Sequence, residues 1–148
     1  MKFIDSYFDR ITGISSVELQ HRGKRFKGFA YLHPEDKDKA SAFAGCAYAE
    51  QRAYIKALKY ERARLKEEAE FCRKFVKACS GYKNWDPKSP VAKIVYRQLN
   101  RKIKAVNDIT DEINDELFRL QYRIGRRDIV LKEIEKNKQN KLNDNSEN

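Results

Sequence analysis

The side chains best suited to chemistry in this sequence are cations gathered between residues 73 and 104. Ten lysines and arginines stand there against a single acid, Asp86, so the stretch carries +9 of the chain's net +10. Basic side chains displace the counterions of nucleic-acid phosphates, and aromatic rings stack on unpaired bases. The sequence therefore predicts a nucleic-acid or partner-binding site made of Arg73, Lys74, Lys77, Tyr82, Lys83, Trp85, Lys88, Lys93, Arg97, Arg101 and Lys104.

Two interpretations of the aromatic residues in this stretch stay open. Trp85 and Tyr82 could stack on a base, or they could fill the end of a helical hairpin against Phe71, Phe75 and Val76. The first interpretation makes them ligand contacts, and the second makes them part of the core.

A second basic cluster is a further candidate for phosphate contact, although a solvated turn explains it equally well. It consists of Arg22, Lys24, Arg25 and Lys27, which surround a glycine between two predicted strands.

No residue set points to catalysis. The chain has no glycine-rich phosphate loop, no Ser-His-Asp set and no Cys-His pair in a supporting context. The three cysteines form no Cys-x-x-Cys pair, so we interpret them as small buried hydrophobes. Carboxylates cluster at residues 108–116, but cations of the preceding helix favour ion pairs over a metal site there: Arg52, Lys56, Lys59, Arg62 and Lys66. We expect no enzymatic activity, no cofactor and no metal.

Two long helices must position the basic residues. Across residues 90–134, apolar side chains recur at alternating spacings of four and three, the heptad pattern of a helix packed on another helix. Residues 34–81 carry a matching pattern, and the short connection makes the two helices antiparallel neighbours. The sequence predicts a mainly α fold, a long antiparallel coiled-coil helical hairpin with helices over 34–81 and 89–135 and the basic cluster at its tip.

The first 33 residues are predicted to add a short helix and a β-hairpin. Phe3, Ile4, Tyr7, Phe8 and Ile11 share one face of a helix over residues 1–12. Residues 17–21 and 26–32 flank a glycine turn and predict the hairpin. The alanine-rich segment 40–49 would let another element, such as this hairpin, approach closely.

Domain organisation and location follow from composition. We expect a single domain over residues 1–136 and a disordered polar tail over 137–148, which has almost nothing to bury. No apolar run is long enough for a membrane span and no signal peptide is evident, which predicts a cytoplasmic protein without membrane contact. The apolar stripe Phe71, Phe75, Ala78 and Tyr82 lies off the heptad seam and predicts a homodimer.

The sequence favours a non-enzymatic accessory protein that binds nucleic acid or a nucleoprotein complex through the basic hairpin tip. The alternative is a small protein-binding inhibitor or adaptor, of phage or mobile-element type, that blocks a nucleic-acid-processing enzyme. The acidic surface or the nucleic-acid groove of that enzyme would then receive the same basic tip. No helix-turn-helix, zinc-finger or RNA-recognition sequence is present, so base-specific readout is not indicated. DNA, RNA and protein partners stay open.

Overall fold

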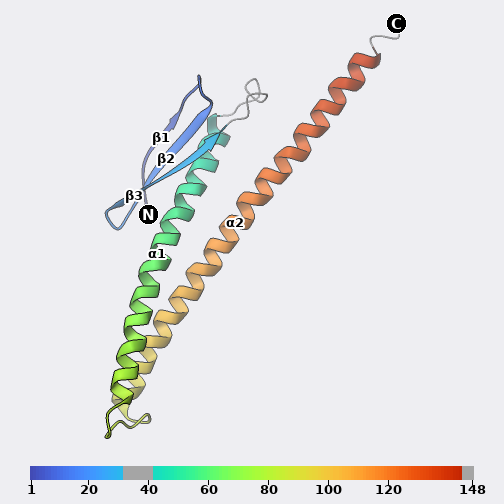
Figure 1. The fold of residues 1–148 in the computed structure, drawn as a ribbon. Coiled ribbons are helices and arrows are strands. Elements are labelled where there is room, and N and C mark those ends of the chain that lie inside the picture. Colours follow the sequence, from blue (N-terminus) through green and yellow to red (C-terminus); the bar gives the residue numbers. More distant parts are fainter. Residues whose placement is uncertain (32–41, 145–148) are drawn as a thin grey trace. The chain divides into compact units, whose positions relative to one another are not determined.

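The computed structural model describes residues 1–31 and 42–144, with side chains described through residue 125. It divides into two compact units, residues 1–114 and 115–148, and we describe each by itself. The mainly helical fold class is confirmed, together with one three-stranded antiparallel sheet (Figure 1). The elements in chain order are β1 (Lys2–Phe8), β2 (Ile14–His21), β3 (Lys24–Tyr31), α1 (Ala42–Ser80) and α2 (Pro90–Asp144).

The prediction of a helix over residues 1–12 is wrong, because residues Lys2–Phe8 form strand β1. This strand pairs antiparallel with β2, with Phe3 opposite Leu19, and the register shifts between Phe3 and Asp5. A bulge interrupts the alternation of a strand, so neighbouring apolar residues imitate the spacing of a helix face. Pairing with β2 satisfies the backbone of this segment and overrides the helical periodicity.

The predicted β-hairpin is confirmed. Strands β2 and β3 pair antiparallel, with His21 opposite Lys24. The two residues between them, Arg22 and Gly23, have φ angles of 49° and 77°. Tight two-residue hairpin turns with positive φ at both positions match the twist of the flanking strands. Residue 32, the predicted end of the second strand, lies outside the described residues.

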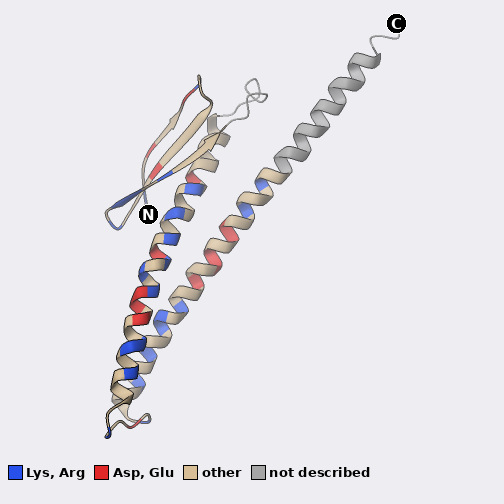
Figure 2. Ribbon diagram, in the orientation of Figure 1, with Lys and Arg blue, Asp and Glu red and all other residues tan. Residues whose placement is uncertain are grey.

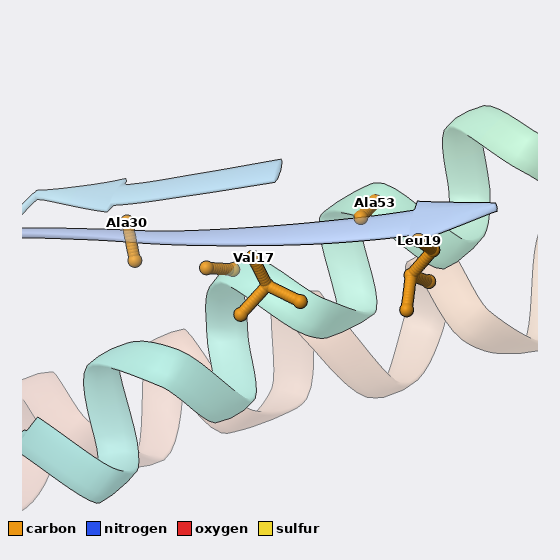
Figure 3. Packing of buried hydrophobic residues seen from close by; sticks show 5 residues of the cluster. Val17, Leu19, Ala30 and Ala53 are labelled. Atoms are coloured by element: carbon orange, nitrogen blue, oxygen red, sulfur yellow. The ribbon is translucent and has the colours of Figure 1, made fainter. Parts of the chain in front are cut away.

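One face of the sheet packs against the first part of α1. Val17, Leu19 and Ala30 of the sheet and Ala49 and Ala53 of α1 form a buried cluster (Figure 3). The small helix residues bring the two backbones together, as the alanine-rich segment predicts. This contact anchors a sheet that would be marginally stable by itself.

Two cations of α1 cover the free edge of β3. Arg52 donates from Nη1 to the Phe29 carbonyl oxygen at 2.6 Å, and Lys56 donates from Nζ to the Lys27 carbonyl oxygen at 2.7 Å. The expected pairing of these cations with the carboxylates at 108–116 is therefore replaced by contacts with an edge strand. Capping the edge carbonyls discourages pairing with a strand of another chain.

The helix boundaries agree with the prediction around the connection between the helices. Helix α1 ends at Ser80, and the Ser89 hydroxyl accepts a hydrogen bond from the Ala92 amide at 3.1 Å, as expected of the cap that starts α2. The predicted start of the first helix at residue 34 lies outside the described residues.

Helix α2 reaches Asp144, farther than the predicted end at residue 135 and into the predicted disordered tail. Residues 136–144 contain no glycine or proline, so nothing in the backbone stops the helix there. The last four residues of the chain lie outside the described residues, and the domain boundary at residue 136 stays a prediction.

Side chains join the two helices within residues 1–114. Lys102 Nζ lies 2.5 Å from Glu68 Oε2, and the Tyr54 hydroxyl donates to the Glu112 carboxylate. Glu68 follows Tyr54 along α1, whereas its partner Lys102 precedes Glu112 along α2. The two segments therefore run in opposite directions. Several heptad positions are buried in this unit: Ile55, Leu58, Ala69, Ala92 and Ile113. No helix in the described part of the chain has the length and apolar character needed to cross a bilayer.

Candidate nucleic-acid interface

The first turns of α2 carry a straight row of cations, which we call the basic stripe: Lys93, Arg97, Arg101 and Lys104. Spacings of four, four and three place these residues on one helix face, over roughly 16 Å at 1.5 Å per residue. All four side chains are exposed, and together with Tyr96 and Asn100 they line an open hollow. Figure 2 shows Lys and Arg on this part of α2, close to its connection with α1.

Most of the charge in the basic stripe is uncompensated. Lys93, Arg97 and Arg101 have no ion pair or hydrogen-bond partner on their side chains among the described residues. Lys104 differs, because its Nζ lies 2.8 Å from Asp108 Oδ2 and this contact raises the pKa of its ammonium group. The stripe can therefore accept several phosphate groups without first breaking internal ion pairs.

The other predicted cations divide into paired and unpaired groups. Arg73 pairs with Glu70 at 2.9 Å within α1. The remaining lysines are exposed and have no ion-pair partner in the part of the chain that the structure describes: Lys74, Lys77, Lys83 and Lys88.

Trp85 is partly engaged in packing. Its ring meets Tyr96 edge-on, with 6.4 Å between centroids, and its indole N–H is buried without an acceptor among the described residues. Phe71 and Phe75, which would enclose it if it filled the hairpin end, are 72% and 51% exposed. Tyr82 is 74% exposed and is the more accessible ring for stacking.

Each cation of the secondary basic turn has a partner inside the molecule, although two of the four share a single carboxylate. Arg22 Nε lies 2.8 Å from Glu61 Oε2, and the Lys24 ammonium lies 4.6 Å from the centroid of the Tyr60 ring. Two further cations share one carboxylate, that of Glu18: Arg25 at 3.5 Å and Lys27 at 3.8 Å. The turn is thus a weaker candidate for phosphate contact than the basic stripe.

Glu61 is the centre of a network that the sequence analysis did not identify. Hydrogen bonds from Arg64, Arg22 and His21 lower the pKa of its carboxyl from 4.5 to about 2, although partial burial acts in the opposite direction. Arg64 also pairs with Glu68, which Lys102 of α2 contacts in turn. The network ties the hairpin turn, α1 and α2 together. Helical spacing places Glu61, Arg64 and Glu68 side by side, and only the fold brings His21, Arg22 and Lys102 to them.

Sequence reasoning also missed Tyr96 and Asn100 as lining residues of the stripe. Their positions three and seven residues after Lys93 place them on or beside the same helix face, so helical spacing alone was sufficient to find them.

Comparison of the chain with protein-family models, curated proteins and solved structures gives no match. Within the described residues, no three His, Cys, Asp or Glu side chains gather in a way that could hold a metal ion. The three cysteines are free and half-buried.

Proposed function

We propose that this protein is a non-enzymatic accessory protein that binds nucleic acid or a nucleoprotein complex through the basic stripe. The observation that carries the proposal is the row formed by Lys93, Arg97 and Arg101, which are exposed, aligned and free of internal partners in the described structure. Leaving three like charges side by side is unfavourable in the free protein. Contact with phosphates would remove that repulsion and release counterions.

The binding is expected to be electrostatic and strongly salt-dependent. Each phosphate contact contributes roughly 0.7–0.9 to the slope of log affinity against log salt concentration. Three or four contacts from the stripe therefore predict roughly a 20- to 150-fold loss of affinity between 50 and 200 mM salt. Single-stranded DNA, duplex DNA and RNA are the three probes to compare by fluorescence anisotropy.

A charge-matched pair of variants tests the stripe. The double substitution Arg97→Glu and Arg101→Glu should weaken binding strongly and reduce the salt slope by about 1.4–1.8, because two phosphate contacts are lost. The control, Lys59→Glu with Lys66→Glu, makes the same charge change at two exposed positions of α1. Equal affinity and equal salt slopes for both doubles would overturn the proposed site.

We also propose that α1 and α2 form the antiparallel coiled coil predicted from the heptads. The Glu68–Lys102 ion pair and the burial of Ile55, Leu58 and Ile113 support this arrangement. A cytoplasmic location is proposed on the basis of the free cysteines, since oxidising compartments favour disulfides.

A second candidate function is binding to a protein. Phe71 and Phe75 of α1 are exposed, as is Tyr82 just after the end of that helix, and exposed apolar stripes often mark protein–protein contacts. A second copy of this chain could cover them, which would make the protein a homodimer. In the inhibitor or adaptor alternative, the basic tip would instead meet an acidic surface or the nucleic-acid groove of a nucleic-acid-processing enzyme. Absence of binding to all three nucleic-acid probes at low salt would favour this candidate.

A further inference from the structure

The face of the sheet that points away from the core carries a row of aromatic side chains. Residues directly opposite one another on paired strands lie on the same face. Tyr7 of β1 and Phe29 of β3 both lie opposite Ser16 of β2, and Tyr31 lies opposite Ile14. Alternation places these residues on the face opposite that of Val17 and Leu19, which pack on α1 (Figure 3).

The rings of Tyr7 and Tyr31 are open to a ligand, and the Phe29 ring is partly exposed, with the Lys56 ammonium 5.8 Å from its centroid. Tyr7, Phe29 and Tyr31 are 62%, 38% and 68% exposed. Ser16 is the small residue between two of them, and neighbouring strands are about 4.8 Å apart, so Tyr7 and Phe29 stand about 10 Å apart at their Cα atoms. The gap above Ser16 therefore offers a flat aromatic ligand a polar floor with a ring on either side.

Polar and charged groups border the aromatic row. A hollow on this face is lined by Asp5, Tyr7, Ser16, Glu18 and Lys27, among other residues. The two carboxylates can accept hydrogen bonds from the exocyclic amines of bases, as acidic side chains do from cytosine.

Cations on the same face complement phosphate. Lys27 and Arg25 share the single carboxylate of Glu18 at 3.8 and 3.5 Å, so one positive charge is left over. Lys2, opposite Gln20 on the same face, adds another. These exposed pairs are weak, and a phosphate can compete for the cations.

From this juxtaposition we propose that the outer face of the sheet binds unpaired bases of single-stranded nucleic acid. Tyr7, Phe29 and Tyr31 stack on the bases, and Arg25 and Lys27 contact the backbone. Sheets that present exposed aromatics bind single strands in this way, whereas bases in a duplex are already stacked and are not accessible. The inference rests on the proposed function and extends it, because the basic stripe attracts any phosphate backbone while the sheet selects single strands.

The test compares three probes at low salt: a short single-stranded oligonucleotide, an abasic strand of equal length and a duplex of the same sequence. The variant Tyr7→Ala with Tyr31→Ala removes two exposed rings. Tyr7→Phe with Tyr31→Phe keeps the rings. Phe43→Ala is the matched control, because Phe43 is an aromatic residue that is 84% exposed and lies on helix α1 and not on the sheet.

The expected result is a selective loss. The alanine double variant should lose at least about 5-fold in affinity for the single strand, since stacking is worth roughly 5- to 150-fold per base. Binding to the abasic strand and to the duplex should stay unchanged, and the phenylalanine double and Phe43→Ala should bind like the wild type. Unchanged thermal unfolding excludes loss of folding as the cause.

Two other outcomes would overturn the inference. If the wild type binds the probes and the alanine double variant binds each of them with the same affinity as the wild type, the sheet face is not a base-binding site. The proposed function then stands. If the wild type binds none of the probes, both the inference and the proposed function fail.

Discussion

Replacing Gly28 by alanine should separate β3 from α1. Gly28 is buried at the point where the strand crosses the helix, and its missing side chain permits the contact. A Cβ atom at this position would lie 1.8 Å from the Ala49 carbonyl oxygen and 2.5 Å from the Ala53 amide nitrogen. Both obstacles are helix backbone, so no change of side-chain rotamer can relieve the clash.

The size of the effect follows from the required displacement. Contacts of a Cβ atom below 3.0 Å are essentially never found, so the strand must retreat by more than 1 Å. Overpacking costs about 1–3 kcal/mol in well-packed cores. A gap of 1 Å also forfeits a quarter to a half of the dispersion contacts of Val17 and Leu19. Together these terms predict a loss of about 3–5 kcal/mol in the free energy of unfolding.

Urea unfolding followed by circular dichroism measures this loss. With a slope of about 2 kcal/mol per molar urea, the midpoint should fall by about 2 M. Gly125→Ala is the control, because a Cβ at Gly125 meets nothing within 4 Å and alanine favours a helix by about 0.5–1 kcal/mol. A loss below about 1 kcal/mol for Gly28→Ala would refute the close-packing argument.

Two further predictions concern Glu61 and Trp85. The pKa of Glu61 is lowered from 4.5 to about 2, so its contribution to stability is present above pH 4.5 and is lost as the pH falls through about 2. Glu61→Gln should therefore cost about 1–2 kcal/mol at pH 6 and progressively less toward pH 2, whereas a difference independent of pH would contradict the network. Trp85→Phe should be at least as stable as the wild type, because it removes a buried N–H that lacks an acceptor and keeps the ring near Tyr96. Trp85→Ala should lose roughly 1–3 kcal/mol in thermal unfolding, and an unchanged melting temperature would assign the ring to ligand contact alone.

The sequence by itself determined the two long helices and the hairpin, because their signals are local. Heptad spacing picked out some of the buried helix positions, such as Ile55, Leu58 and Ile113. Other heptad positions are half-buried, and Ile124 is 39% exposed. The Ser89 cap and the turn at Gly23 depend on a few neighbouring residues, so they were predictable too. The row formed by Lys93, Arg97 and Arg101 is likewise a matter of helical spacing.

Only the tertiary structure decided the role of the first strand and the state of the charges. Residues 2–8 have a helix-like apolar pattern, and pairing with β2 made them a strand with a bulge. From the density of positive charge alone, the turn around Arg22 and the tip around Arg97 are both candidates for phosphate contact. The fold makes them different, because carboxylates pair with the cations of the turn: Glu61 of α1 contacts Arg22, and Glu18 of β2 contacts Arg25. No described carboxylate reaches Arg97. Electrostatic pairing depends on distances between segments, and local sequence does not encode those distances.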